Sequence, residues 1–449
     1  MTDISLREVT PGQVTRVVIL GGGFGGVLTA RTLAKEAKAS GINLRITLVD
    51  KNNYFLFTPM LPEVGTGVLD SQHITQSLRD ATREIGVAFS QAAVTQLDAP
   101  NRTVTTDVGV IPYDVLVIAL GATTNYFGMK DVEAVAYTFK DIPDAVRFHT
   151  RVLQMLEQSD REPDAIKRRA LLSFVIAGGG LTGVELAADL ADFLAQTMHK
   201  EYPRLAPADM SIAVVEAMSM LLPGMAPAVQ QLTQAHLEAK GVRVLLNTPV
   251  TGATADAVKT EKAGDLPLGT LIWTAGIVGN SLLKSFPFET TRGTRVLCDD
   301  TLQVTNWRGV YALGDCSFVN NAITSKPYAQ SAQIAEQEAK HVAANVLRGI
   351  RGQSLQPFSY DPLGVLISLG DRYSIVDVRH LRLSGLPGYL TWKALYLAKL
   401  PSWRNRVTVL SDWLIGTVAG RSTVQRDAPA PGTDTTAPPP AAPITTTAA

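Results

Sequence analysis

Residues 16–50 read RVVILGGGFGGVLTARTLAKEAKASGINLRITLVD, and this stretch is the strongest indication of the fold. Its first apolar run, residues 17–20, is short and β-branched, as is typical of a buried parallel strand. Residues 21–26 are almost entirely glycine, and a helical pattern of apolar residues follows them. A second apolar run, residues 46–49, ends at Asp50. The stretch therefore predicts a strand, a tight turn, a helix and a second parallel strand.

The residue types in this turn are those that a dinucleotide site needs. Gly21 permits the tight turn, Gly23 lets the backbone approach a pyrophosphate, and Gly26 lets the helix pack closely on the strand. Asp50 can accept hydrogen bonds from both ribose hydroxyls, although it lies further along the chain than the usual interval of about 20 residues. A plain glycine-rich turn is the alternative, but strand, helix, second strand and acid together favour a dinucleotide. The candidate residues of this first site are Gly21, Gly23, Phe24, Gly25, Gly26, Asp50 and Lys51.

The same pattern recurs later in the chain. Residues 174–177 predict a strand, residues 178–183 read GGGLTG, a helix follows, and a further strand over 212–215 ends at Glu216. An acid at that position favours a free ribose 2′-hydroxyl, because it would repel a 2′-phosphate, so we expect NADH rather than NADPH. The candidate residues of this second site are Gly178, Gly180, Thr182, Gly183 and Glu216.

Three other apolar strands run directly into small residues, over 113–123, 270–276 and 309–315. Such turns let the backbone approach a cofactor closely, whereas an ordinary strand end is the alternative interpretation. The acid that ends the third of them can bind a sugar-alcohol hydroxyl. The candidate residues here are Gly121, Ala122, Ala275, Gly276, Gly314 and Asp315.

Three polar residues are candidates for the chemistry itself. Glu185 lies in the first helical turn after the second glycine motif, where it either complements the helix dipole or points toward a nicotinamide. Residues 328–348 predict a helix, on which Gln333 and Gln337 are four apart and share a face. These glutamines either face solvent or offer amides to a carbonyl substrate.

Residues 53–70 are aromatic but broken by proline and glycine, so they predict a loop that packs on the core or covers a flat ring system.

Composition excludes several classes of protein. Lys and Arg number 41, as do Asp and Glu, so the chain lacks the net positive charge of a nucleic-acid binder. Its two cysteines, Cys298 and Cys316, have neither a C-x-x-C nor a zinc spacing, so we expect a reducing compartment, no metal and a buried Cys316. The first ten residues do not resemble a secretory signal. No apolar run of about 18 residues occurs, so no transmembrane helix is expected.

The C-terminal part differs in character from the rest. Residues 386–420 mix leucine and aromatic side chains with Lys and Arg at helical spacing, and they hold three of the five tryptophans. This mixture suits helices that lie in a membrane interface, whereas a dimer interface or core helices are the alternative. Residues 426–449 are rich in Ala, Pro and Thr and predict a disordered tail.

The fold class that these patterns predict is α/β, with two Rossmann-like dinucleotide-binding domains and a C-terminal membrane-associating region. The first domain should be discontinuous, with the second inserted into it. The expected limits are 12–165 and 291–352 for the first dinucleotide-binding domain, 166–290 for the second, 353–425 for the C-terminal region, and 426–449 for the tail.

Together these motifs resemble a known family, the type II NADH:quinone oxidoreductases, or alternative NADH dehydrogenases, which are flavoproteins with two dinucleotide-binding domains. The resemblance covers residues 14–421. Several of its segments are shared across the wider flavoprotein class, while the loop, the glutamine motif and the C-terminal region are more particular to this family. The segments that carry it are VVILGGGFGG, NYFLFTPMLPEVGTG, ALGATTNYFG, FVIAGGGLTGVELA, WTAG, GVYALGDCS, AQIAEQ and the Trp-rich C-terminal region.

The resemblance implies roles for individual residues. The first glycine motif with Asp50, and Gly314 with Asp315, look like the FAD site, and the second motif with Glu216 looks like the NADH site. Glu185 looks like the acid near the nicotinamide and flavin, and Gln333 and Gln337 look like quinone-site residues. The C-terminal helices look like a membrane anchor at the rim of the quinone site, and the protein is expected to be a homodimer on the cytoplasmic face of the cell membrane. Many bacterial members have a lysine where this chain has Leu363, so no role of that lysine carries over.

The expected reaction is FAD-dependent oxidation of NADH with two-electron reduction of a membrane quinone, without proton pumping. The absence of a cysteine pair speaks against a dithiol relay. Two alternatives stay open: an NADH-dependent reductase of a protein acceptor such as a ferredoxin, and a slow NADH-sensing flavoprotein.

Overall fold

The structure is a computed structural model that describes residues 14–321, 324–379 and 381–426, and these residues form two compact units. The first unit contains the described residues up to Val64 together with Val68–Asn125 and Gly276–Gly420. The second contains Gly65–Gly67, Tyr126–Ala275 and the described residues from Arg421 onward. The stretch predicted not to be a secretory signal, and the tail predicted to be disordered beyond Arg426, lie outside the described residues. The expected domain limits stay predictions.

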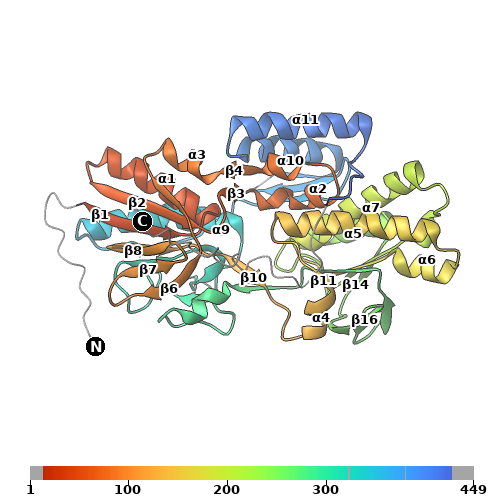
Figure 1. Cartoon of the computed structure of the whole chain (residues 1–449), viewed down its shortest axis with the longest axis horizontal. Coiled ribbons are helices and arrows are strands. Elements are labelled where there is room, and N and C mark those ends of the chain that lie inside the picture. Colours follow the sequence, from red (N-terminus) through yellow and green to blue (C-terminus); the bar gives the residue numbers. More distant parts are fainter. Residues whose placement is uncertain (1–13, 322–323, 380, 427–449) are drawn as a thin grey trace, which may run out of the picture. The chain divides into compact units, whose positions relative to one another are not determined.

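A five-stranded parallel sheet forms the centre of the first unit (Figure 1). Its central strands are buried apolar runs because helices and a second sheet cover its two faces, whereas the edge strand over residues 88–91 is partly exposed. Their order is β21 (Val310–Ala312), β9 (Val115–Ile118), β1 (Thr15–Leu20), β2 (Leu44–Asp50) and β5 (Ala88–Gln91). The predicted strand, turn, helix and strand are thus confirmed, with α1 (Phe24–Ala39) as the helix, and α1 packs against α9 (Ala332–Ile350).

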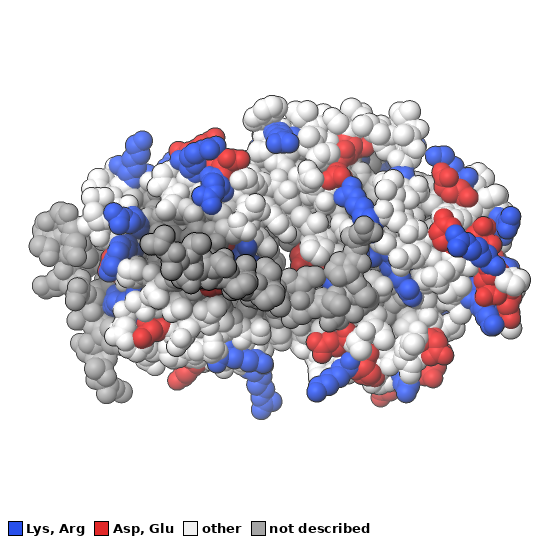
Figure 2. All heavy atoms as spheres, viewed as in Figure 1, with Lys and Arg blue, Asp and Glu red and all other residues white. Residues whose placement is uncertain are grey.

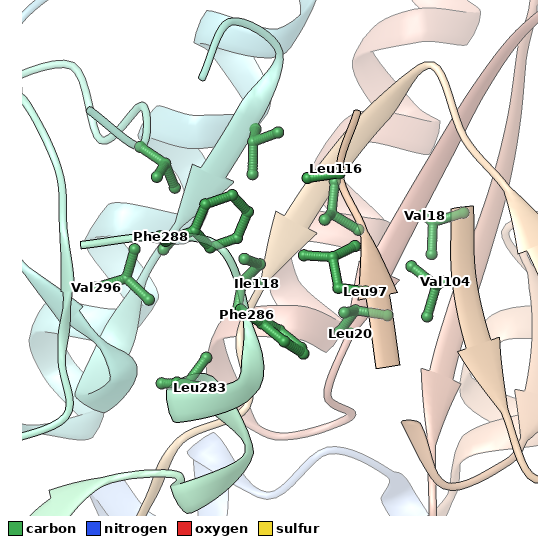
Figure 3. Close-up of a cluster of buried hydrophobic side chains, with 14 of the residues drawn as sticks. Val18, Leu20, Leu97, Val104, Leu116, Ile118, Leu283, Phe286, Phe288 and Val296 are labelled. Carbon is green, nitrogen blue, oxygen red and sulfur yellow. The ribbon is translucent and has the colours of Figure 1, made fainter. Parts of the chain in front are cut away.

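A three-stranded antiparallel sheet covers one face of the parallel sheet. It consists of β6 (Val94–Asp98), β7 (Thr103–Thr106) and β8 (Gly109–Pro112). Apolar and polar residues alternate around residues 101–102, and this pattern predicts a β-meander over residues 87–106. The prediction is confirmed for β6 and β7, but Ala88–Gln91 instead extends the parallel sheet, because its backbone pairs with that of β2. Figure 3 shows how side chains from β1 and β9 meet those of β6, β7 and the segment 283–296. Those labelled there are Val18, Leu20, Leu97, Val104, Leu116, Ile118, Leu283, Phe286, Phe288 and Val296.

The second unit repeats the arrangement of the first. Its parallel sheet has the order β11 (Ala136–Tyr137), β18 (Thr270–Trp273), β12 (Ser173–Ala177), β13 (Ser211–Val215) and β14 (Val242–Leu245). A three-stranded antiparallel sheet again accompanies it, formed by β15 (Val250–Ala253), β16 (Ala257–Thr260) and β17 (Asp265–Pro267). Its helices are α4 (Lys130–Val135), α5 (Ile142–Arg161), α6 (Ala165–Leu171), α7 (Leu181–Glu201) and α8 (Pro227–Ala239). The helix predicted after the second glycine motif is α7.

Two predicted stretches take their shape from caps and prolines. The helix predicted over 328–348 begins only at Ala332, because the Ser331 hydroxyl accepts a hydrogen bond from the Ile334 N–H and caps the first turn. The predicted loop over 53–70 contains only short elements, as its prolines and glycines require. These are β3 (Tyr54–Leu56), which pairs with β4 (Thr75–Ser77), η1 (Thr58–Met60), α2 (Leu61–Gly65) and, just after the loop, η2 (Ser71–Ile74).

The C-terminal part of the first unit combines a small sheet with two helices. The sheet consists of β23 (Val365–Ser368), β24 (Ser374–Val378) and β25 (Leu381–Leu383). The helices are α10 (Gly385–Lys399), which packs on β24, and α11 (Trp403–Ala419), which lies beside α10 (Figure 1). Over the described residues, no helix combines the length and apolar character that crossing a membrane requires.

Candidate functional site

The first glycine turn connects β1 to α1 in a shape that only glycines permit. A Cβ on Gly26 would lie 1.8 Å from the Gly21 carbonyl oxygen, so the helix can start this close to the strand only without a side chain. Gly23, by contrast, has no heavy atom of the described residues within 4 Å of its Cβ position. The turn therefore leaves open space beside the N-terminus of a 16-residue helix, where backbone N–H groups attract an anion.

Asp50 fixes this turn from the end of β2. One of its carboxylate oxygens accepts a hydrogen bond from the Gly22 N–H at 2.6 Å, and the other accepts one from the Asn52 N–H at 2.7 Å. Burial raises the pKa of Asp50, while these two hydrogen bonds and the charge of Lys51 act in the opposite direction. Each oxygen retains a lone pair for a ribose hydroxyl, so the geometry suits the predicted role.

Two further predicted segments lie beside the same turn. The carbonyl oxygen of Ala119 lies 2.2 Å from the Cβ position of Gly21, which places the residues before Gly121 and Ala122 against the turn. The side chain of Leu313 lies 2.2 Å from the Cβ position of Gly25, which brings Gly314 and Asp315 to the start of α1. All candidate residues of the first site therefore come together, except that Lys51 is exposed at the edge.

Glu338 on α9 is a residue of this site that sequence reasoning missed. Its side chain is only 2% exposed, and its carboxyl oxygen accepts the Gly314 N–H at 2.5 Å. Burial raises the pKa of Glu338 to about 8, although the Gly314 N–H and the charge of Arg295 act in the opposite direction. Nothing in the sequence around Glu338 indicated this role, because its partner, Gly314, lies on a separate segment.

The second glycine turn, between β12 and α7, repeats the first almost atom for atom. A Cβ on Gly183 would lie 2.0 Å from the Gly178 carbonyl oxygen, and around the Cβ position of Gly180 the described chain again places no heavy atom within 4 Å. Glu216 takes the place of Asp50, because its carboxylate accepts the Gly179 N–H at 2.6 Å and the Met218 N–H at 2.8 Å. The backbone of Ala275 lies 2.7 Å from the Cβ position of Gly178, whereas Gly276 belongs to the first unit.

Glu185 lies on α7, two residues after Gly183, and its side chain is 8% exposed. Thr182, at the matching position to Gly25, stands at the start of the same helix. Each unit thus holds one complete cradle for a dinucleotide, consisting of an open helix N-terminus and a carboxylate at the end of the next strand. These residues fit two dinucleotides, one on each unit.

Comparison with known families identifies this arrangement. The pyridine nucleotide-disulphide oxidoreductase family matches residues 15–339, and the NDH2 C-terminal domain matches residues 363–422. The chain belongs to the type II NADH dehydrogenases (NDH2). The first match spans most of the chain, including both cradles, and the second spans β23 to β25, α10 and α11.

Individual relatives agree with this membership over nearly their whole length. The demethylphylloquinone reductase NdbB of Synechocystis is 31% identical over 89% of this chain and 95% of its own. The type II NADH:quinone oxidoreductase NdhA of Mycobacterium tuberculosis is 29% identical over 92% and 89%. An external alternative NADH-ubiquinone oxidoreductase of Yarrowia lipolytica is 28% identical over 90% and 80%.

Solved structures show the same fold. NDH2 from Plasmodium falciparum in complex with NADH has a TM-score of 0.83 at 23% identity, over 91% of this chain and 99% of that chain. The sulfide:quinone oxidoreductase of Aquifex aeolicus has a TM-score of 0.70 at 19% identity, over 92% and 99%. The predicted α/β fold with two Rossmann-like sheets is confirmed.

The two predicted glutamines on α9 hold a neighbouring segment of the NDH2 domain. The amide of Gln333 donates to the Gly364 carbonyl at 3.1 Å and accepts from the Leu363 N–H at 3.1 Å and from the Tyr360 hydroxyl. Gln337 donates to the Asp361 carbonyl at 2.7 Å and accepts from its N–H at 3.1 Å. Both amides therefore bind the backbone of residues 361–364, which here includes Leu363.

A chain of aromatic rings joins the first cradle to the C-terminal helices. The ring of Phe24, in the glycine turn, lies 5.7 Å from that of Phe57, which lies 5.8 Å from that of Tyr396 on α10. Tyr396 in turn contacts Trp392 at 4.4 Å, and Trp392 lies 6.3 Å from Trp413 on α11. The loop predicted to pack on the core or cover a ring system thus contacts both the glycine turn and α10.

Helix α11 leaves many of its apolar side chains exposed. Its inner face is held by polar contacts: Asn405 donates to the His73 and Thr75 carbonyls at 2.8 and 2.7 Å, and the Trp413 indole donates to buried Glu63 at 3.0 Å. The surface at the top of Figure 2 is mostly uncharged, with few Lys and Arg side chains. The exposed apolar residues of α11 are Trp403, Val407, Leu410, Leu414, Ile415 and Val418.

Both cysteines are structural residues. Cys316 is buried, as predicted, and Cys298 is partly buried. Burial raises the pKa of the Cys316 thiol to about 12 and that of the Cys298 thiol well above its ordinary value. The Cys316 thiol donates to the carbonyl of Leu313 in the core. Neither thiol has the lowered pKa that a reactive cysteine needs, despite the disulphide chemistry in the name of the wider family.

Proposed function

We propose that this chain oxidises NADH and reduces a membrane quinone by means of a bound FAD, without pumping protons. The observation that carries the proposal is the pair of matching cradles, each with its own carboxylate, in a chain of the NDH2 family. FAD and NADH are the two dinucleotides of this family's reaction. The overall balance is that NADH and one proton reduce the quinone to a quinol and leave NAD+.

The residues of the first cradle would hold FAD, which supplies the two-electron chemistry between NADH and the quinone. The open N-terminus of α1 suits its pyrophosphate, and Asp50 suits its ribose. Gly314 and Asp315 lie at the start of α1, where they can bind the sugar-alcohol chain. Asp315 can hold that chain because a carboxylate accepts hydrogen bonds from hydroxyl groups.

The residues of the second cradle would hold NADH. Glu216 can accept hydrogen bonds from the ribose hydroxyls, and its charge would repel the phosphate that NADPH carries at the same place. We propose that Glu185, buried in the first turns of α7, holds a proton or water for the reduction step. Replacing Glu185 by Gln should then slow quinone reduction; an unchanged rate would reject this role.

We further propose that the protein is a peripheral membrane protein whose α10 and α11 contact the lipid surface and border the quinone site. The exposed apolar side chains of α11 support this, because the free energy falls when such side chains move from water into lipid. Gln333, Gln337 and the aromatic rings of α10 are the candidate residues of the quinone side. A homodimer on the cytoplasmic face of the cell membrane completes the proposal.

A liposome flotation experiment tests the membrane contact. Leu414 and Ile415 are 62% and 60% exposed on α11, and replacing both by Glu should lower vesicle binding about a hundredfold, because burying each such side chain contributes about 1.5–3 kcal/mol. The control replaces Val108 and Val110 by Glu, since these are equally exposed apolar residues on the β7–β8 hairpin. Equal flotation of both variants and the wild type would reject α11 as the contact.

The reaction itself is tested in two anaerobic half-reactions with the FAD-loaded protein. NADH should bleach the flavin absorption rapidly, and a short-chain quinone should restore it. Bleaching without recovery would support the NADH site but would indicate that the electron acceptor is a protein instead of a quinone. A purified protein that retains no flavin would reject the assignment of the first cradle.

A further inference from the structure

The chain that leaves α11 does not stay with the first unit. α11 ends at Ala419, Gly420 has a φ of +86°, and residues 421–426 belong to the second unit. We call residues 421–426 the strap. The helix that carries the proposed membrane contact is thus joined, through one glycine, to a segment bound to the unit with the second cradle.

Arg421 anchors the strap on α7. Its guanidinium donates to the Asp189 carbonyl at 2.9 Å and lies 3.9 Å from the Asp192 carboxylate, which also binds Lys240, the residue just after α8. The Arg421 side chain is only 5% exposed. A buried guanidinium needs such partners, because leaving it without them is costly, so the position of α7 and that of Arg421 depend on one another.

The contacts of Arg421 lie close to Glu185 along α7. Glu185, Asp189 and Asp192 follow one another at intervals of four and three residues, so they share one face of the helix. The same helix begins at Gly180–Gly183, the turn of the second cradle. Because a helix moves as a rigid rod, a shift at Asp189 also displaces Glu185 and the turn.

Two other contacts fasten the strap to the second unit. The Ser422 N–H donates to the Gly67 carbonyl at 2.9 Å, and Gly67 has a φ of +72° with its Cβ position 2.5 Å from the Ser422 carbonyl oxygen. The Thr150 hydroxyl on α5 donates to the Arg426 carbonyl at 2.9 Å and accepts its N–H at 3.3 Å. The strap is therefore held at its first, second and last residues, by three separate parts of the unit.

We propose that Arg421 is a positioning residue for the NADH site, and that the strap holds α7 in the place that NADH binding requires. This inference rests on the proposed function, because it takes the second cradle as the NADH site. It makes the C-terminal region contribute to the first half-reaction as well as to membrane and quinone contact. Arg421 does this through α7 and needs no contact with NADH itself.

The experiment compares Arg421→Met and Arg421→Lys with a matched control in the FAD-loaded full chain. The control is Arg161→Met on α5, since Arg161 is 79% exposed and pairs with Glu157 on the surface, at 3.3 Å. Arg421→Met should raise the KM for NADH about fivefold or more, the lower end of typical coupling factors, and weaken NAD+ binding in calorimetry by the same factor. Arg421→Lys should recover part of the loss, because an ammonium can still pair with Asp192, and Arg161→Met should match the wild type.

Two more variants test the strap without touching its charges. Thr150→Val removes both contacts to Arg426 at nearly constant volume, and Gly67→Ala places a methyl group against Ser422. Each should raise the KM for NADH and increase hydrogen exchange in α7, while the FAD content stays at the wild-type level.

The outcomes separate this inference from the function on which it rests. If the wild type oxidises NADH but Arg421→Met keeps the wild-type KM and NAD+ affinity, the positioning role is wrong. If Arg421→Met fails to fold, unchanged KM and hydrogen exchange in Thr150→Val and Gly67→Ala would likewise overturn that role. A wild type that binds FAD but neither binds nor oxidises NADH would overturn the proposed function instead.

Discussion

Glu338 shows how a single buried acid can make stability depend on pH. Its carboxyl group lies in the core beside Gly314, and burial raises its pKa to about 8 from an ordinary value of 4.5. The folded protein therefore retains a proton there that the unfolded chain releases. The resulting stabilisation is complete below about pH 4.5 and is lost as the pH rises toward about 8.

We predict that Glu338→Gln removes this dependence, because the amide is uncharged and its oxygen can still accept the Gly314 N–H. Thermal unfolding from pH 5 to 8.5 should show the variant gaining on the wild type by up to about 1.4 kcal/mol per pH unit. Glu84→Gln, at an exposed position after α3 (Leu78–Arg83), serves as the control and should run parallel to the wild type. A constant difference between Glu338→Gln and the wild type would contradict the raised pKa.

Among individual residues, the sequence predicted those whose partners lie within the same recognisable sequence motif. Asp50 and Glu216 each end a strand that follows a glycine turn, so their place could be expected. Glu338 and Arg421 could not, because their partners, Gly314 and α7, lie on segments that only the folded chain brings close. The role of the glutamine amides was predictable only in part, since their spacing indicated a common helix face but not the backbone segment that they bind.

Helix α9 holds the segment at the start of the NDH2 domain through two glutamine side chains. Gln333 makes three of the hydrogen bonds to residues 360–364, which lie just before β23. Gln337 makes two more, so Gln333 makes the larger share of the glutamine hydrogen bonds from α9 to this segment. Its position should therefore be sensitive to that side chain.

We predict that Gln333→Leu lowers quinone-dependent turnover about tenfold or more, since small displacements of a binding site cost that much, while reduction of ferricyanide by NADH is retained. Leucine has a similar volume but makes none of the three hydrogen bonds. Lys340→Leu, at an exposed position on the same helix, is the control. Equal loss with both acceptors would show that α9 itself, and not the quinone side, had been damaged.

Element types were largely predictable, and the exceptions have local causes. The buried strands and the helices after both glycine motifs follow from apolar runs and glycine spacing. The start of α9 was misplaced because the cap of Ser331 outweighs the small-residue pattern that precedes it. Ala88–Gln91 was assigned to the meander because an alternating pattern does not state which strand is its neighbour.

The molecule as a whole contains the same dinucleotide-binding arrangement twice, with a glycine turn and a carboxylate in equivalent places in each unit. The equivalence makes a matched pair of substitutions possible. In each unit, the same glycine faces the same carbonyl oxygen across the turn, at 1.8 Å from the Cβ position in one and 2.0 Å in the other.

We predict that Gly26→Ala and Gly183→Ala separate the two sites. The first should leave a protein without FAD, while the second should keep its FAD but bind NADH at least about tenfold more weakly, because about 1.4 kcal/mol of lost binding corresponds to that factor. Flavin absorption after purification and NAD+ calorimetry measure the two effects. Loss of FAD in both variants, or in neither, would contradict the independence of the cradles.

The repeat and the α/β class were predictable, because both depend on motifs that recur in order. The strap was not, since nothing in residues 421–426 marks the surface to which they bind. Likewise, the sequence showed that the C-terminal helices mix apolar and charged side chains, but not which of the apolar side chains stay exposed.

The order of the segments also has a consequence for synthesis. β21 completes the sheet of the first unit although its residues are made long after β9, and the strap completes the second unit after α11 has been made. Neither unit can therefore finish folding before the ribosome has synthesised the chain to about residue 421. Buried parallel strands must wait without their neighbours during that time, which predicts that a nascent chain of this protein depends on chaperones more than one whose domains are contiguous.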